Sequence, residues 1–123
     1  MDDIAFGLYG YGKVAELHAR ALSRTPGARL VSVCGRDAAK RDAFAARWDC
    51  ASRSSPAELA DRDRVAALVV TTPHPFHAAH AIESFEAGLH VLIEKPLALR
   101  VEECDAMIAA AARARRRPSL PAP

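Results

Sequence analysis

The sequence predicts an α/β fold, in which a parallel β-sheet carries helices on both faces. Short apolar segments rich in β-branched residues, such as residues 29–34 and 65–70, alternate with segments of helical periodicity, and the connections between them are short. The first apolar segment begins at Ile4 and runs straight into closely spaced glycines that open a helix. Because such connections between parallel strands are right-handed, we expect a Rossmann-type doubly wound parallel sheet with strand order 3-2-1-4-5.

Size, charge and cysteine content restrict the class of protein. The 123 residues have the size of one domain with a single core. The formal net charge of +2, from 17 basic and 15 acidic residues, gives no global field that favours nucleic acid or an anionic membrane as partner. An acidic start and short apolar runs indicate a cytoplasmic protein without a signal peptide or membrane span. Cys34, Cys50 and Cys104 are widely spaced, which favours small buried residues over a disulfide or zinc site.

The glycines after the first strand predict a dinucleotide-binding turn. Gly10, Gly12 and Ala15 fit the spacing G-x-G-x-x-G/A. In such a turn Gly10 permits the tight bend, Gly12 lets a pyrophosphate approach the backbone, and Ala15 lets the helix pack closely on the strand. Three small residues could match by chance, but here a strand precedes them and a helix with free N–H groups follows. The candidate cofactor-binding residues of this turn are Gly10, Tyr11, Gly12, Lys13 and Val14.

The end of the second strand bears on the choice between NAD and NADP. The strand over residues 29–34 ends at Gly35, about 20 residues beyond the glycines, where an acidic residue in NAD-specific sites accepts from the ribose 2′-hydroxyl. This chain has Gly35, Arg36 and Asp37 instead. With no carboxylate at Gly35 to repel a phosphate, the guanidinium of Arg36 beside it favours the 2′-phosphate of NADP, so NADP is the expected cofactor and NAD the alternative. Asp37 could also simply cap the next helix.

The first two helices are predicted from apolar spacing and from the residues that end them. Residues 13–24 have helical periodicity and stop at Pro26 and Gly27. Residues 38–49 form the second helix, followed by a brief strand over residues 51–53. The apolar stripe of the first helix is expected to comprise Val14, Leu17, Ala21 and Leu22, and the core residues of the second Ala39, Phe44 and Trp48.

Capping residues and charge predict the segment that leads to the central strand. Residues 54–56, Ser-Ser-Pro, are typical of a helix N-terminus and predict a short helix through Leu59. The alternating charges of residues 61–64 indicate a solvated link. Residues 65–70 then form a nearly continuous apolar run, as expected for a strand covered on both faces.

The loop after this strand is a second candidate site. The apolar run breaks at residues 71–77, Thr-Thr-Pro-His-Pro-Phe-His, where two prolines cannot continue a strand. Open α/β sheets bind ligands at this carboxyl end of their strands. A helix over residues 76–87, ended by Gly88, and a buried strand over residues 90–93 should follow. A last amphipathic helix is expected over residues 101–112.

Taken together, these motifs resemble the Gfo/Idh/MocA family of NAD(P)-dependent oxidoreductases from about residue 4 to residue 112. The glycine turn followed by His18 is similar to the family's cofactor turn. Thr72 and Pro73 with His77 are similar to its loop after the fourth strand. Residues 87–96, Ala-Gly-Leu-His-Val-Leu-Ile-Glu-Lys-Pro, are similar to its best-marked motif. The combination is specific, whereas each part alone is not.

The resemblance implies hydride transfer between the nicotinamide and a carbon that bears a hydroxyl or carbonyl, commonly on a sugar or polyol. Lys95 would be the catalytic lysine that donates to the reacting oxygen. It also implies that Glu94 lies near the nicotinamide ribose and that the loop with Thr72, Pro73 and His77 borders the cofactor. In the alternative reading Lys95 is a surface lysine and His77 a helix-start histidine bonded to backbone. No metal site is expected, because Pro75 interrupts the helical spacing of the nearby histidines.

The chain departs from the family pattern after residue 112. Complete members continue into a second α/β domain that binds substrate, and that domain is absent from this sequence. Residues 113–123 are basic and proline-rich, which predicts a disordered tail after a Rossmann domain over residues 1–112, with truncation or a shifted reading frame as one explanation. Two functions remain open, an oxidoreductase acting on a small carbonyl or polyol substrate, or a non-catalytic NADP-binding module. Without the second domain, the apolar surface that it normally covers would be exposed, and this predicts self-association.

Overall fold

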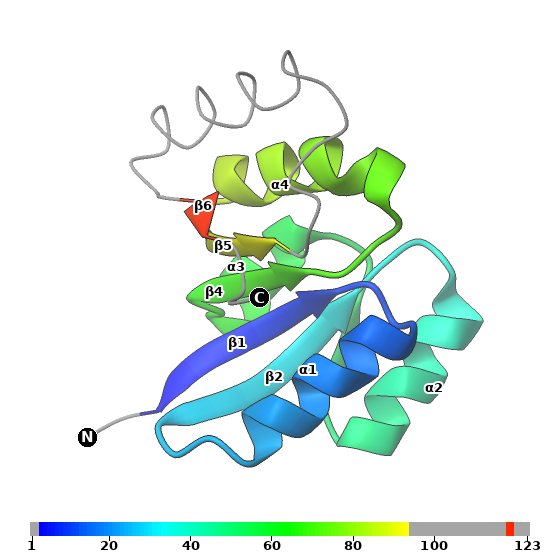
Figure 1. The fold of residues 1–123 in the computed structure, drawn as a ribbon, viewed down its shortest axis with the longest axis vertical. Helices are drawn as coiled ribbons and strands as arrows, with labels where there is room; N and C mark the ends of the chain where they lie inside the picture. The colour runs from blue at the N-terminus through cyan, green and yellow to red at the C-terminus, as the bar shows by residue number, and fades with distance from the viewer. Residues whose placement is uncertain (1–2, 94–117, 120–123) are drawn as a thin grey trace.

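A computed structural model describes residues 3–93 and 118–119 of the chain. Its centre is a sheet of parallel strands in the order β3-β2-β1-β4-β5-β6 (Figure 1). The expected order 3-2-1-4-5 is therefore confirmed, and β6 extends the sheet beyond β5. The strands are β1 (Ile4–Tyr9), β2 (Ala28–Cys34), β3 (Ala51–Arg53), β4 (Ala67–Val70), β5 (His90–Ile93) and β6 (Pro118–Ser119).

Helices cover both faces of this sheet, as the doubly wound fold requires (Figure 1). On one face α1 (Lys13–Ser23) and α2 (Ala38–Trp48) enclose a core centred on Leu8 and Phe44. On the other face α3 (Pro56–Asp63) and α4 (His77–Glu86), which the short 3₁₀ helix η1 (His74–Phe76) precedes, enclose a core centred on Leu68 and Phe85. Among the helices that the structure describes, none is long and apolar enough to cross a bilayer.

The face of helix α1 that packs on the sheet is not the apolar face predicted from the sequence. Ala15 and Ala19 are fully buried, whereas Val14 is 39% and Leu17 64% exposed. Alanines at i and i+4 allow the helix axis to approach the sheet closely, which the longer side chains would prevent. The tight packing expected at Ala15 is confirmed, and the stripe containing Val14 and Leu17 was the wrong choice of buried face.

Helix α2 follows its prediction in part. Phe44 is fully buried and Trp48 half-buried, but Ala39 is exposed and does not belong to the core. Asp37 caps the helix, since its side chain accepts a hydrogen bond from the Lys40 N–H. The helix ends where Asp49 adopts a left-handed conformation with φ 51°.

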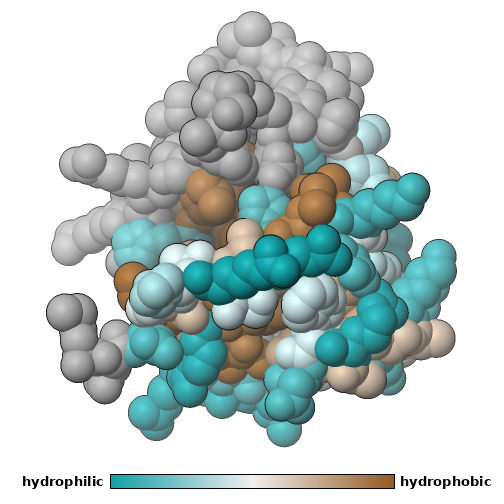
Figure 2. All heavy atoms as spheres, turned by 60° about the horizontal axis from the view of Figure 1, so that its bottom comes forward, coloured by the Kyte–Doolittle hydropathy of each residue, from teal (hydrophilic) through white to brown (hydrophobic). Residues whose placement is uncertain are grey.

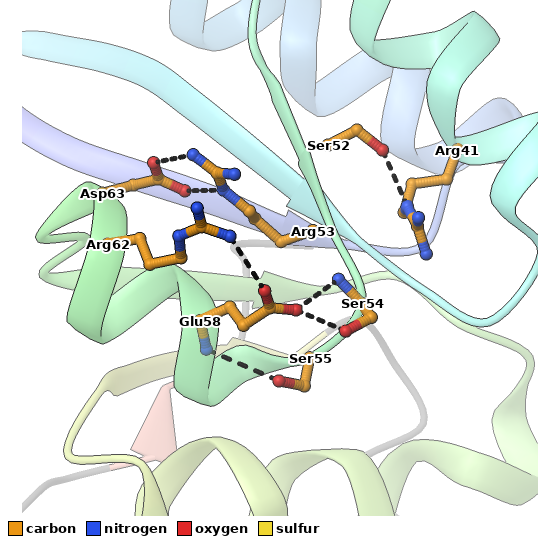
Figure 3. A network of polar contacts seen from close by, with 8 residues as sticks. All are labelled: Arg41, Ser52, Arg53, Ser54, Ser55, Glu58, Arg62 and Asp63. Atoms are coloured by element: carbon orange, nitrogen blue, oxygen red, sulfur yellow. Dashed lines mark hydrogen bonds and ion pairs between the residues drawn. The ribbon is translucent and has the colours of Figure 1, made fainter.

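Helix α3 begins as predicted and ends later than predicted. Ser55 accepts from the Glu58 N–H, and the Glu58 carboxylate accepts in return from the N–H and hydroxyl of Ser54 (Figure 3). The helix then continues to Asp63, so residues 61–63 are helical and not part of a link, although Asp61, Arg62 and Arg64 are exposed as expected. The reason is an ion pair, in which Arg53 at the end of β3 donates two hydrogen bonds, 2.9 and 2.8 Å long, to the carboxylate of Asp63 (Figure 3).

The segment expected to be a disordered tail contributes a strand. Pro118 and Ser119 form β6, which pairs in parallel with Val91 and Leu92 of β5. A proline is compatible with this position because β6 lies at the edge of the sheet, where one side of the strand needs no hydrogen-bond donor. The helix expected over residues 101–112 lies outside the described residues.

Candidate functional site

The glycine turn lies at the carboxyl end of β1, between the ends of β2 and β4 (Figure 1). Gly10 has φ 112°, and its N–H donates to the carbonyl of Cys34 over 3.0 Å. A Cβ added at Gly10 would lie 2.7 Å from the Thr71 hydroxyl oxygen. That hydroxyl donates to the carbonyl of Tyr9, as does the Thr71 N–H, each over 2.9 Å. Glycine is thus required at position 10 by both conformation and space.

The N-terminus of α1 is open where the turn meets it. Gly12 is the N-cap, which offers no side chain to the first N–H groups of the helix. A Cβ added at Gly12 would meet no atom within 4 Å, and Gly12 is exposed. Uncapped N–H groups and the positive end of the helix dipole together suit a phosphate group. Lys13, at the first helical position and exposed, adds a positive charge there.

One acidic residue in the first turn of α1 is neutralised by α2. Glu16 would repel an anion at this helix N-terminus if it were unpaired. Its carboxylate instead accepts from both Nε and an Nη of Arg47, the Nε bond being 3.0 Å long. The Arg47 guanidinium also lies 5.5 Å from the centre of the Phe44 ring. The pairing leaves Lys13 as the charge next to the open turn.

The end of β2 contacts the glycine turn through Tyr11. The Tyr11 ring lies on Gly35, since a Cβ added at Gly35 would be 2.3 Å from the ring atom Cε1. The Tyr11 hydroxyl accepts a hydrogen bond of 2.9 Å from the Asp37 N–H. Arg41 donates from Nη1 to the Gly35 carbonyl over 2.8 Å. Its Nε donates to the Ser52 hydroxyl over 2.7 Å (Figure 3). Between these anchored residues the side chain of Arg36 is exposed.

The loop after β4 completes the edge of the sheet. Thr72 lies against the glycine turn, its Cγ2 being 3.2 Å from a Cβ added at Gly10, and Pro73 is exposed. His77 is 1% exposed, and its Nε2 lies 2.6 Å from the Thr72 carbonyl oxygen. Because a carbonyl only accepts, Nε2 carries the proton and donates. This is the backbone-bonded arrangement given above as the alternative for His77, and it makes His77 a support for the loop.

A polar cluster beneath this edge has no counterpart in the sequence motifs. The Tyr9 hydroxyl donates to Glu83 over 2.7 Å, and the Tyr9 ring stacks on His80 with centroids 4.1 Å apart. The Nδ1 of His80 lies 2.7 Å from the Thr72 hydroxyl oxygen, and the Phe76 ring also stacks on His80, with centroids 5.7 Å apart. The sequence indicates this cluster only in that Tyr9 and His80 are polar aromatic residues at positions where apolar residues would otherwise fill the core.

Burial controls the protonation of this cluster. Burial first, and then the hydrogen bond to Glu83, raise the pKa of the Tyr9 hydroxyl far above its usual value. Burial also lowers the pKa of His80. The positive charge of Arg36 opposes the rise in the pKa of Tyr9 and contributes to the lowered pKa of His80. Tyr9 is therefore a neutral hydrogen-bond donor and His80 a neutral ring at physiological pH.

The cysteines take no part in this site. Cys34 is fully buried at the end of β2, and burial raises the pKa of its thiol far above the usual value. Burial likewise raises the pKa of the half-buried Cys50 to about 11. Both are free thiols, and Cys104 lies outside the described residues. Across residues 3–93 and 118–119, no group of three histidine, cysteine or acidic side chains is placed to hold a metal ion.

The structure thus gathers most of the predicted site residues at one edge of the sheet. The glycine turn, the exposed Arg36 and the loop with Thr72 and Pro73 come from the ends of three neighbouring strands, β1, β2 and β4. The contact between Tyr11 and Gly35, which the sequence motifs did not indicate, joins the first two. Glu94 and Lys95 follow directly after β5 in the sequence but lie outside the described residues.

Comparison with known proteins identifies this arrangement. The family model for the oxidoreductase family with an NAD-binding Rossmann fold, Gfo/Idh/MocA, matches residues 4–120. Inositol 2-dehydrogenase 3 of Saccharopolyspora erythraea is 35% identical over 102 residues, which is 82% of this chain and 30% of that protein. A glycosyl hydrolase family 109 protein of Shewanella sp. (strain W3-18-1) is 32% identical over 114 residues, 85% of this chain and 25% of that protein.

Solved structures share the fold of this chain and match it over nearly its whole length. The WlbA dehydrogenase of Bordetella pertussis, in complex with NADH and UDP-GlcNAcA, superimposes with a TM-score of 0.89 and 32% identity over 97% of this chain and 37% of that one. This chain therefore spans about a quarter to a third of the length of the relatives that it matches. The family match covers the strands, the glycine turn and the loop after β4, and it extends past residue 112 to β6. The chain belongs to the Gfo/Idh/MocA family of oxidoreductases and comprises its NAD-binding Rossmann domain.

Proposed function

We propose that this chain binds NADP at the carboxyl edge of its sheet and supplies the cofactor-binding half of an oxidoreductase. The observation that carries this proposal is the open turn at Gly12, where the N-cap of α1 has no side-chain hydrogen bond and an added Cβ would meet no atom of the described residues within 4 Å. The reaction proposed is hydride transfer between the nicotinamide and a hydroxyl- or carbonyl-bearing carbon of a sugar- or polyol-like substrate. An inositol dehydrogenase and a dehydrogenase crystallised with a UDP-sugar acid among the relatives support this substrate class.

Each segment of the edge has a distinct role in binding. The first N–H groups of α1 and the ammonium of Lys13 would hold the pyrophosphate, and Gly12 lets it approach the backbone. Arg36 would bind the 2′-phosphate bidentately, because Gly35 places no carboxylate beside it. Thr72 and Pro73 would border the nicotinamide half, on a loop that His77 holds from beneath. When bound, the cofactor would supply the hydride as NADPH or accept it as NADP⁺.

The proposed chemistry depends on Lys95. A lysine directly after β5 would follow a strand that pairs with β4, on the edge where the loop with Thr72 lies. There its ammonium would donate a hydrogen bond to the reacting oxygen and stabilise negative charge that develops on it. Glu94 would hydrogen-bond the nicotinamide ribose. Both roles follow from the family motif.

Fluorescence titration with NADPH and NADH tests the cofactor. We expect NADPH to bind more tightly than NADH, and Arg36→Ala to weaken NADPH binding about tenfold or more while changing NADH binding little, since only NADPH carries the 2′-phosphate. Arg24→Ala is the matched control, because Arg24 is also an exposed arginine and lies at the C-terminal end of α1, away from the glycine turn. Absence of binding by folded protein would contradict the proposal, and equal effects on both nucleotides would contradict the role of Arg36.

A second candidate function is a non-catalytic NADP-binding module, which is favoured because the two described histidines beside the turn, His77 and His80, are both bonded to Thr72. Turnover separates the two. NADPH oxidation is measured with a panel of sugar-derived carbonyl compounds for the wild type and Lys95→Ala. A rate that falls by about a hundredfold or more in the variant, with NADPH affinity retained, supports catalysis. Equal background rates support the binding module.

A further inference from the structure

We propose that Tyr11 is a positioning residue for nucleotide selectivity, because its ring fills the space that any side chain at residue 35 would need. This inference rests on the proposed NADP-binding function. It means that a residue of the glycine turn, as well as the residues at the end of β2, determines whether NADP or NAD is preferred. The acidic residue that a 2′-hydroxyl site requires at position 35 is then excluded by the ring of Tyr11 and not merely missing.

The contact between Tyr11 and Gly35 leaves no room for a Cβ. A Cβ added at Gly35 would lie 2.3 Å from Cε1, 3.1 Å from Cδ1 and 3.2 Å from Cζ of the Tyr11 ring. These atoms form one rigid edge of the ring, so a small adjustment at the tip of the side chain cannot relieve the overlap. Even alanine at position 35 therefore requires the Tyr11 ring to rotate away from Gly35 and to give up its hydrogen bond with the Asp37 N–H.

The ring is also held in place from the other side. Its hydroxyl accepts from the Asp37 N–H over 2.9 Å, and Asp37 in turn caps α2 by accepting from the Lys40 N–H. Arg41 fixes the Gly35 carbonyl over 2.8 Å. The turn that displays Arg36 is thus anchored before and after that residue, and Tyr11 is one of the anchors.

The consequence for selectivity follows from where the adenosine ribose binds in this fold. The ribose lies beside the residue that ends the second strand. In this chain that position presents the Tyr11 ring over Gly35, whose hydroxyl oxygen already accepts from the Asp37 N–H, and the exposed guanidinium of Arg36, which only donates. A 2′-phosphate finds a cation there. Changing residue 35 alone would therefore not convert the site to NADH, because Tyr11 must change with it.

A double-mutant cycle tests this coupling. NADPH and NADH affinities are measured for the wild type, Gly35→Asp, Tyr11→Ala and the double variant. We expect Gly35→Asp alone to weaken both nucleotides, because the displaced ring disturbs the turn. With Tyr11→Ala present, the same aspartate should raise NADH affinity relative to NADPH about tenfold more than it does in the wild-type background. Equal changes of this ratio in both backgrounds would overturn the inference.

Uncharged substitutions measure the steric overlap between a side chain at position 35 and the Tyr11 ring, without the effect of an added charge. Gly35→Ala should lower the thermal midpoint in the wild type and in Tyr11→Phe, which keeps the ring, but much less in Tyr11→Ala. If Gly35→Asp fails to fold, these alanine variants decide: equal destabilisation with and without the ring overturns the inference. Wild-type protein that binds neither nucleotide refutes the proposed function instead, whereas wild-type binding with additive substitutions refutes only the role of Tyr11.

Discussion

Gly10 and Gly12 stand two residues apart in one motif, but the structure gives them different reasons to be glycine. Gly10 combines a positive φ of 112° with a Cβ position blocked by Thr71 and Thr72. Gly12 has an ordinary φ of −91° and open space around it. The first glycine is therefore required by the folded protein itself, whereas the described residues would leave room for a side chain at position 12.

Alanine substitutions should separate these two requirements. We expect Gly10→Ala to lower the free energy of unfolding by about 2–4 kcal/mol through strain and overlap. Gly12→Ala should change it by less than about 1 kcal/mol, yet weaken NADPH binding about tenfold or more by placing a methyl group where the pyrophosphate approaches. Urea unfolding and fluorescence titration measure the two quantities. Unchanged NADPH affinity in Gly12→Ala would mean that the open turn is not the phosphate site.

Helices and strands are predicted correctly from the sequence where the residues that determine them are adjacent in the chain. The strands and the start of α3 follow from apolar runs and capping residues that are adjacent in the chain. The buried face of α1 was missed because Ala15 and Ala19 carry less hydrophobicity than Leu17, although close approach to the sheet favours them. The extension of α3 was missed because Asp63 is paired with Arg53 of β3, a contact between residues distant in the sequence.

That ion pair makes a pH-dependent contribution to stability. The Asp63 side chain is 8% exposed, and hydrogen bonds from Arg53 hold the pKa of its carboxyl below the usual 3.8. Its stabilising effect is thus complete above about pH 4 and is lost as the pH falls through the lowered pKa, where the carboxylate takes up a proton. We expect Asp63→Asn to lower the free energy of unfolding by about 2–3 kcal/mol at pH 7, and by much less near pH 2.

Urea unfolding of the wild type and Asp63→Asn between pH 2 and pH 7 measures this difference. Asp61→Asn on the same helix is the control, because Asp61 is exposed and its loss should cost less than about 0.5 kcal/mol at any pH. A gap between wild type and Asp63→Asn that does not change with pH would show that packing, and not charge, explains the effect.

At the scale of the whole molecule, the predicted site is built from three turns that the sheet brings together. The motifs located the glycine turn, Arg36 and the loop after β4 because each is continuous in the sequence. They could not locate the contact of Tyr11 with Gly35 or the bond from His77 to the Thr72 carbonyl, because both depend on how neighbouring turns meet. The roles of Glu94 and Lys95 remain predictions from the family motif.

The surface also carries apolar side chains that the fold leaves uncovered. On the face drawn in Figure 2, hydrophobic residues emerge between hydrophilic ones. Leu17, 64% exposed, and Val14, 39% exposed, lie on α1 close to the open turn. Both faces of the sheet already have their helices, so these side chains add nothing to either core. The remaining large apolar side chains that are exposed in the described residues are Ile4 and Phe76.

We therefore predict that the chain self-associates through this part of α1. Leu17→Glu should shift the protein towards monomer at little cost to the free energy of unfolding, because the side chain is largely exposed and a charge there opposes apolar contact. Sedimentation velocity over a range of concentrations measures the change. Ala43→Glu, an exposed position on α2, controls for the added charge. Wild-type protein that stays monomeric at high concentration contradicts the prediction, and an equal shift in both variants would attribute association to net charge, not to the α1 surface.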